Sequence, residues 1–286
     1  MKIGIVTDST SDLPQELVSQ YDIEVVPLNV LMDNQNYRDG IDLTSTEFYQ
    51  KLKLSSSLPT TSQPSPGVFV EVYRTLLKKV DAILSIHLSE AFSGTVRTAR
   101  IAREILPEAD IRVIDSKSTS IGLGGLVVEA ARAVGRGMKL DEVVKLVEGL
   151  REKIHFLVTL NTLEYVRKGG RVSYLQAFFG SILQVKPLLK LAPGKVELVE
   201  RVRTRREALS RLLSEFKSQL ATETEGIIAV MHTVAEEEAG KLQAIIKETF
   251  RNAEIIINQA GPVLGTHAGP GALALISVPK ADPALL

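Results

Sequence analysis

Four segments of this 286-residue chain combine hydroxyl, carboxylate and glycine residues in a way that could bind a ligand. They are residues 7–14, 60–67, 89–95 and 261–271, which read TDSTSDLP, TTSQPSPG, SEAFSGT and GPVLGTHAGPG. Each is too polar or too rich in glycine and proline to be core, and each lies at the end of a predicted strand. Because ligands of open α/β sheets bind outside the carboxyl ends of the strands, these segments are candidate binding loops.

The Ser93-Gly94-Thr95 sequence could hold an anion. At the start of a helix it would offer backbone N–H groups, the positive end of the helix dipole and two hydroxyls. Helix capping accounts for one of these hydroxyls, so an ordinary helix start is the alternative.

Helix capping explains parts of two other segments. Ser65, which precedes a proline, is a good helix start, but Thr61 lies outside that cap and is left unexplained. After the first strand, Ser11 or Asp12 would cap a helix that begins near Pro14. One helix does not need all the hydroxyls and carboxylates of residues 7–12, so some of them would hold neighbouring loops.

Residues 261–271 contain four glycines and two prolines around His267, which follows Thr266. This composition requires unusual backbone geometry or the close approach of another group. A single histidine is more often structural than functional, but this glycine-rich setting favours a role facing the ligand.

The sequence carries none of the common cofactor or nucleophile motifs. It lacks a phosphate-binding P-loop, and the glycines of residues 122–125 do not have the spacing of a dinucleotide site. It contains no cysteine and only four scattered histidines, so we expect no metal site and no bound cofactor. A nucleophile elbow is absent as well, although Ser93, His267 and a carboxylate could form a hydrolase triad from distant positions.

The composition of the chain argues against several classes of protein. Lys and Arg total 34 and Asp and Glu total 34, a balance that argues against a dedicated nucleic-acid binder. With 44% hydrophobic residues the chain is not a disordered acidic protein, and its length suggests two domains. The first apolar run is too short for a signal peptide, and no stretch is long enough to span a membrane. We therefore expect a cytoplasmic protein.

Strand and helix patterns alternate in the first half of the chain. Short apolar runs predict parallel strands, and apolar residues at helical spacing predict the helices between them. The predicted strands cover residues 2–7, 82–86 and 111–114, and the predicted helices cover residues 67–79, 93–106, 118–134 and 140–150. This alternation implies a parallel sheet with right-handed crossovers.

The pattern changes near residue 154, where we place a boundary between domains of residues 1–154 and 155–286. Strands are predicted at residues 155–160, 226–231, 254–258 and 272–278, a hairpin at residues 186–202, and helices at residues 174–183, 205–220 and 235–250. The apolar face of the helix at residues 174–183 would pack on its own sheet or line a ligand tunnel.

Taken in order, these segments resemble the DegV family, which includes fatty-acid-binding proteins. The resemblance covers essentially the whole chain and also rests on Asp115-Ser116-Lys117-Ser118, Gly169-Gly170-Arg171 and Val202-Arg203-Thr204-Arg205. It implies an α/β fold of two domains. An N-terminal Rossmann-like parallel sheet would carry Ser/Thr-rich carboxylate-binding loops, a C-terminal mixed sheet would carry the glycine-rich His loop, and the ligand would lie between them.

The resemblance also implies a function. A long-chain fatty acid such as palmitate, stearate or oleate would lie in an apolar tunnel and be the bound ligand. Its carboxylate would be held by Thr61, Ser93, Gly94 and His267. Ser62, Thr95 and Thr266 would support these residues.

The fatty acid would be presented to a partner enzyme, and the protein itself would catalyse no reaction. The partner implied by the resemblance is a dihydroxyacetone-kinase-like bacterial fatty acid kinase, which phosphorylates the carboxylate with ATP. The acyl phosphate would enter phospholipid synthesis, with a downstream acyltransferase as a further partner. Transient membrane contact is compatible with this role, and no binding of nucleic acid is expected.

The balanced total charge hides a basic middle segment. Residues 151–211 carry 13 basic and 5 acidic side chains, whereas the segments on either side are net acidic. By the resemblance, Arg171 and Arg203 would dock against an acidic patch of the kinase or against the phosphate being transferred. An ordinary solvated and salt-bridged surface is the alternative.

Two other functions would use the same residues. A lipid ester hydrolase would depend on Ser93 and His267. A lipid-sensing regulatory module would share the binding site and differ in its partners.

Overall fold

The computed structural model describes residues 1–170 and 185–281. The helix predicted at residues 174–183 and the docking residue Arg171 lie outside these residues. No helix within the described ranges is both long and apolar enough to cross a membrane.

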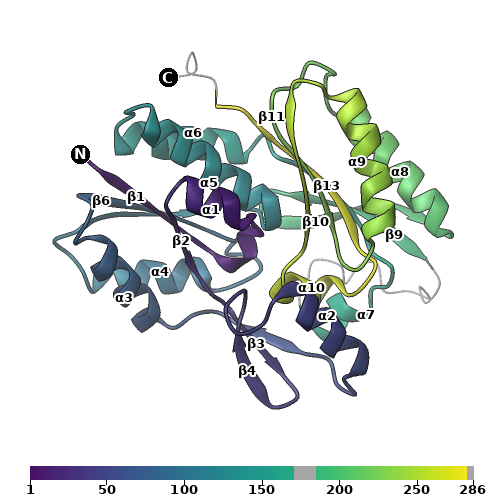
Figure 1. Cartoon of the computed structure of the whole chain (residues 1–286), viewed down its shortest axis with the longest axis horizontal. Helices are drawn as coiled ribbons and strands as arrows, with labels where there is room; N and C mark the ends of the chain where they lie inside the picture. Colours follow the sequence, from purple (N-terminus) through teal and green to yellow (C-terminus); the bar gives the residue numbers. More distant parts are fainter. Residues whose placement is uncertain (171–184, 282–286) are drawn as a thin grey trace.

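The first half of the chain builds a parallel sheet with the strand order β2-β1-β6-β7 (Figure 1). Its strands are β1 (Ile3–Asp8), β2 (Ile23–Val26), β6 (Ala82–His87) and β7 (Asp110–Asp115). Every residue of β1 and of β6 is buried, as expected for central strands covered on both faces. The predicted parallel sheet is therefore confirmed, although β2 was not predicted.

Helices cover both faces of this sheet. One face packs against α3 (Pro66–Leu76) and α4 (Thr95–Glu104), and the other against α5 (Ser120–Gly135) and α6 (Leu140–Arg151). The short helix α1 (Gln15–Gln20) follows a single 3-10 turn at Ser9–Ser11 and lies beside β2. Neither Ser11 nor Asp12 caps α1, contrary to our expectation, because Ser11 belongs to the 3-10 turn and Pro14 occupies the cap position.

The second half of the chain builds a mixed sheet with the order β10-β9-β8-β13-β11-β12. Its strands are β8 (His155–Thr159), β9 (Lys186–Ala192), β10 (Lys195–Val202), β11 (Gly226–His232), β12 (Ala253–Gln259) and β13 (Leu273–Pro279). Only β11 and β12 pair in parallel among these described strands. The helices α8 (Arg205–Ser218) and α9 (Glu236–Thr249) cover one face, so the predicted α/β fold with a mixed second sheet is confirmed.

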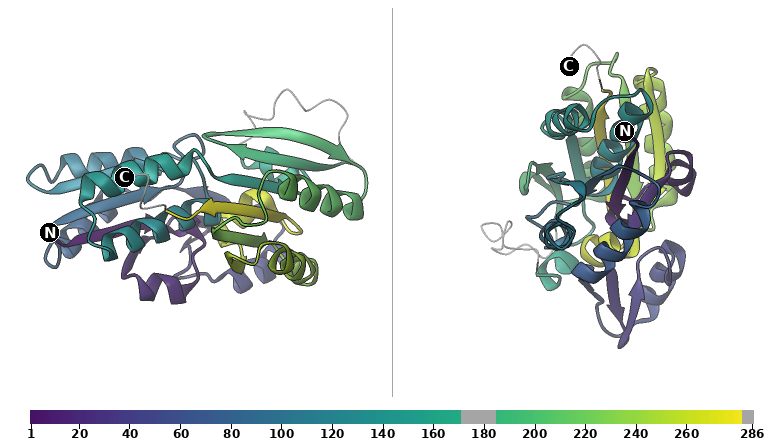
Figure 2. Two further views of the ribbon diagram at one scale, coloured as in Figure 1. Left: turned by 90° about the horizontal axis from the view of Figure 1, so that it is seen from above. Right: turned by 90° about the vertical axis from the view of Figure 1, so that its left-hand side faces the viewer.

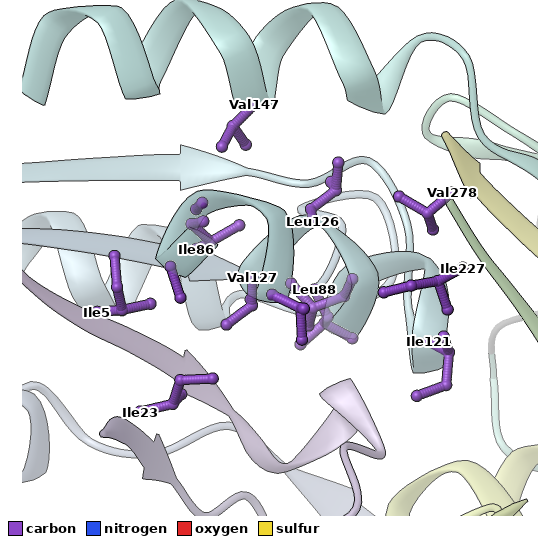
Figure 3. Close-up of a cluster of buried hydrophobic side chains, with 14 of the residues drawn as sticks. Ile5, Ile23, Ile86, Leu88, Ile121, Leu126, Val127, Val147, Ile227 and Val278 are labelled. Carbon is purple, nitrogen blue, oxygen red and sulfur yellow. The ribbon is translucent and has the colours of Figure 1, made fainter. Parts of the chain in front are cut away.

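Helix α5 lies between the two sheets and joins their cores. Figure 3 shows Val127 of α5 among side chains of the first sheet, such as Ile5, while Ile227 and Val278 of the second sheet belong to the same cluster. A Cβ atom at Gly124 of α5 would lie 2.5 Å from the backbone oxygen of Ser11, so glycine is needed for this close packing. The division into two domains at residue 154 stays a prediction, because one hydrophobic cluster draws on both sheets.

A small antiparallel sheet, which was not predicted from the sequence, has the order β4-β3-β5. Its strands are β3 (Asn29–Met32), β4 (Gln35–Arg38) and β5 (Thr60–Ser62), and α2 (Ser45–Leu54) begins at a capping box formed by Thr44 and Glu47. The glycine-rich segment contains a further unpredicted helix, α10 (Pro262–Ala268), and α7 (Glu164–Lys168) lies beside it. Helix α10 contacts α2, β3 and β5, so residues 262–268 lie against residues 29–62 although they are far apart in the sequence (Figures 1 and 2).

Candidate ligand-binding site

Two neighbouring cavities lie where α10 meets the strands of both halves. Their volumes are about 180 and 160 Å³, and they share five lining residues, namely Thr119, Leu191, Val196, Leu264 and His267. The larger cavity is mainly apolar: its other lining residues include Phe156, Val158, Leu160, Val166, Leu189 and Met231. The smaller cavity adds polar residues, namely Thr61, Ser62, Gln63 and Ser93. Together the cavities match an amphipathic ligand with a polar end and an apolar body.

The polar end is organised by a hydrogen bond between Thr61 and His267. Oγ1 of Thr61 lies 2.8 Å from Nε2 of His267, although the two residues are 206 positions apart in the sequence. Thr61 is held on β5, where it pairs with Val30 of β3, and His267 lies in the last turn of α10. The short sheet and the glycine-rich segment therefore place these two side chains together.

The Ser93-Gly94-Thr95 segment starts α4 beside this pair. Oγ of Ser93 lies 2.9 Å from Oγ1 of Thr95, and Gly94 at the cap position has no side chain to satisfy the first N–H groups of the helix. A Cβ at Gly94 would collide with the side-chain amide of Gln63, which donates a 2.8 Å hydrogen bond to Thr98. A side chain at position 94 would therefore displace the Gln63 amide from its contact with α4.

Gln63 lines the smaller cavity and belongs to the predicted binding loop of residues 60–67, but no role of its own was assigned to it from the sequence. It lies in the same segment as Thr61, and its polar side chain next to Pro64 was a signal that could have been used. Gln63 and Ser62 are exposed as well as lining the smaller cavity, so this cavity reaches the protein surface.

The remaining predicted site residues take different places. Thr95 and Thr266 are buried, and the hydroxyl of Thr266 donates to the carbonyl oxygen of Pro262 within α10. Arg203 is exposed just before α8, outside both cavities. The roles assigned to all these residues stay predictions.

Two buried carboxyl groups, those of Asp12 and Asp39, lie near Gly261 at the start of α10. Asp12 accepts hydrogen bonds from Oγ of Ser120 at 2.7 Å and from the backbone N–H of Gly261 at 2.9 Å. Burial raises the pKa of Asp12 to about 7 and that of Asp39 to about 6, because the charged form loses its hydration. Asp12 therefore connects the first residues of α5 and α10, two helices that form cavity walls.

A Ser-His-Asp chain of hydrogen bonds exists in the core, away from the cavities. Oγ of Ser85 lies 2.6 Å from Nε2 of His87, and Nδ1 of His87 lies 3.0 Å from Oδ2 of Asp8. All three side chains are fully buried, and none lines either cavity. This arrangement resembles a hydrolase triad in its geometry, but no substrate can reach the serine.

The hydrolase alternative relied on Ser93 and His267 instead. In the structure Ser93 pairs with Thr95, and Nε2 of His267 pairs with Thr61. Among residues 1–170 and 185–281, no group of three or more His, Cys, Asp or Glu side chains could hold a metal ion. The site thus offers hydroxyl, amide and imidazole groups for binding a polar head.

Comparisons with known proteins identify relatives of this chain. A family model described as an uncharacterised protein of the DegV family matches residues 2–280. A DegV domain-containing protein of Caldanaerobacter subterraneus is 38% identical over 271 residues, which are 95% of this chain and 96% of that protein.

Two solved structures are also similar. One is DegV of Bacillus subtilis, described as a fatty acid binding protein, with a TM-score of 0.92, 34% identity, and coverage of 98% of this chain and 100% of that one. The other, from Eubacterium ventriosum, is described as a stearic-acid-binding protein, with a TM-score of 0.90, 26% identity, and coverage of 98% and 99%.

Proposed function

This chain belongs to the DegV family, and on that premise we propose that it binds a long-chain fatty acid, with palmitate, stearate or oleate as candidates. The carboxylate would lie among Thr61, Ser93, Gly94 and His267, and the acyl chain would extend into the larger, apolar cavity. The observation that carries the proposal is the junction of two apolar cavities, of which the smaller one also contains a cluster of polar residues with the Thr61–His267 pair.

The energetics favour such a ligand. Burying about fifteen methylene groups at ~0.8 kcal/mol each contributes on the order of 10 kcal/mol, before the entropy of immobilising the chain is subtracted. A carboxylate withdrawn from water needs several hydrogen-bond donors. The hydroxyls, the N–H groups at the start of α4 and the imidazole supply them without a strong cation that would hold the acid permanently.

Extraction of the purified protein tests the proposal directly. Denaturing mass spectrometry of freshly purified protein is expected to show a long-chain fatty acid in near-stoichiometric amount. A protein that is consistently free of lipid, and whose melting temperature does not change when palmitate is added, would overturn the proposal.

Ser93→Ala is expected to weaken palmitate binding by roughly 1–3 kcal/mol, the cost of an unmatched hydrogen bond to a charged group. The dissociation constant can be measured by competition with a fluorescent fatty acid. Ser56→Ala, at an exposed serine outside the cavities, is the matched control and should bind like the wild type. Unchanged affinity in Ser93→Ala would remove Ser93 from the site.

We further propose that the bound acid is presented to a dihydroxyacetone-kinase-like kinase and that this chain performs no catalysis. A carboxylate oxygen would attack the γ-phosphorus of ATP, ADP would leave, and the acyl phosphate would pass to an acyltransferase. The smaller cavity reaches the surface at Ser62 and Gln63, which would let an external active site approach the carboxylate. A cytoplasmic location and transient membrane contact belong to the same proposal.

Arg203→Glu is expected to lower the rate of kinase-dependent acyl phosphate formation about threefold or more, since charges at an interface mainly govern the rate of association. Palmitate affinity should stay unchanged, because Arg203 lines neither cavity. Lys145→Glu, on α6, provides the same charge change elsewhere and should leave the rate unaffected. Loss of palmitate binding in Arg203→Glu would contradict a docking role.

A further inference from the structure

Thr119 lies where the two cavities meet. It is one of the five residues that line both, together with His267 of α10. It also immediately precedes α5, a helix of 16 residues whose first turn therefore begins at the cavity wall. No role for this residue was predicted from the sequence.

The hydroxyl of Thr119 lacks a hydrogen-bond partner. Its Oγ1 atom is buried and makes no hydrogen bond to any residue that the structure describes. Most buried hydroxyls in proteins are hydrogen-bonded, so one that is not requires an explanation. A ligand that brings an acceptor to the cavity would provide one.

Helix capping does not use this hydroxyl. A threonine at the cap position normally accepts a hydrogen bond from an N–H of the first turn. Thr119 occupies that position with φ −153° and ψ −179°, yet its side chain makes no cap hydrogen bond. The hydroxyl is thus available for another partner.

The neighbouring backbone is held in an uncommon conformation. Ser120 has φ +49° and Lys117 has φ +53°, in the left-handed region that residues other than glycine rarely adopt. The hydrogen bond from Ser120 to the buried Asp12 at 2.7 Å holds this conformation. The fold therefore fixes the position of Thr119 at the junction of the cavities.

We propose that Thr119 is a further carboxylate-binding residue, whose Oγ1 donates a hydrogen bond to the fatty acid in the cavity that Thr119 lines together with Thr61 and His267. A carboxylate can only accept hydrogen bonds, and a free hydroxyl can donate one. The positive end of the α5 dipole favours a negative charge at the same point. This inference rests on the proposed function and adds a residue to its site.

The test compares two ligands and three variants. Thr119→Val removes the hydroxyl and keeps the shape, Thr119→Ser keeps the hydroxyl, and Thr159→Val is the control. Thr159 on β8 also has a buried Oγ1 without a partner among the described residues, but it lines neither cavity. Palmitate and 1-hexadecanol have chains of the same length and differ in the charge of the head group, and both would compete with a fluorescent fatty acid.

Thr119→Val is expected to weaken palmitate binding about tenfold and hexadecanol binding less than about threefold, because hydrogen bonds to charged groups are the stronger ones. Thr119→Ser and Thr159→Val should bind both ligands within about twofold of the wild type. If Thr119→Val lowers the melting temperature, Thr119→Ala removes the same hydroxyl with less bulk and should show the same losses.

Wild-type affinity for palmitate in both hydroxyl-free variants would overturn the inference, and so would equal losses for the acid and the alcohol. In either case palmitate binding by the wild type would leave the proposed function standing. A wild-type protein that binds neither ligand would overturn the proposed function together with this inference.

Discussion

Replacing His87 with alanine is expected to lower the free energy of unfolding by about 3–5 kcal/mol, the usual cost of removing one partner from a buried pair that includes a carboxylate. The imidazole contacts Asp8 at 3.0 Å and Ser85 at 2.6 Å, and all three side chains are fully buried. Its loss leaves Asp8 with fewer donors and opens a cavity next to Phe69. Since a domain is stable by only about 5–15 kcal/mol, urea unfolding should show the effect clearly.

Tyr73→Phe is the matched control for this network. The hydroxyl of Tyr73 lies 2.8 Å from Oγ of Ser85, so its removal deletes the outermost hydrogen bond and keeps the packing of the ring. We expect a loss of about 1 kcal/mol. If His87→Ala cost no more than Tyr73→Phe, the histidine would not be the centre of the network.

The same network bears on the hydrolase alternative. Ser85 is completely buried and lines neither cavity, so a fluorophosphonate probe should not label it in the native protein. The four segments that looked chemical in the sequence include Asp8 but neither Ser85 nor His87. A local sequence pattern could not reveal this triad-like chain, because Asp8 is 79 residues away from His87.

The parallel sheet could be predicted because its central strands are continuous apolar runs. Residues 82–86 appear in the structure as β6, buried throughout, and residues 111–114 appear within β7. The period of apolar residues likewise indicated α8 and α9 on the second sheet. Burial on both faces leaves a pattern in the sequence, and these elements were therefore accessible to prediction.

The small sheet and α10 could not be predicted in this way. Strand β5 has only three residues, and its stability comes from pairing with β3 and from α10 rather than from its own composition. The four glycines of residues 261–271 did not indicate a helix, and α10 was therefore not predicted. Gly261 and Pro262 are nevertheless acceptable at a helix start. The Thr61–His267 contact depends on both elements. The family resemblance could place both residues near one carboxylate, but the sequence could not reveal the hydrogen bond between them.

The free energy of unfolding of the wild type is expected to decline between pH 5 and pH 8. Asp12→Asn should remove most of this decline. The pKa of Asp12 is raised by burial from 3.8 to about 7, so the folded state holds a proton that the unfolded chain has already lost. Stability from this group is full below pH ~4 and is lost as the pH rises through 7. A difference of one between the folded and unfolded pKa corresponds to about 1.4 kcal/mol, so the decline due to Asp12 is at most ~4 kcal/mol.

Asparagine can take the place of Asp12 because both hydrogen bonds have a neutral counterpart. Its amide oxygen can accept from the N–H of Gly261, and its amide nitrogen can donate to the hydroxyl of Ser120. The variant should therefore come closest to the wild type at pH 5, and its excess in unfolding free energy should grow by roughly 2–3 kcal/mol between pH 5 and pH 8. Asp39, with a pKa of about 6, should leave a smaller decline in place.

Urea unfolding of both proteins at pH 5, 6, 7 and 8 checks this expectation, with Asp42→Asn as the control. Asp42 is exposed, and its hydrogen bonds with Arg38 lower its pKa to about 2, so it stays charged in the folded protein across this range. The control curve should therefore run parallel to that of the wild type. An Asp12→Asn curve that also ran parallel would mean that Asp12 is already ionised at pH 5. The Asp12 contacts with Ser120 and Gly261 would then hold α5 and α10 through a charged carboxylate.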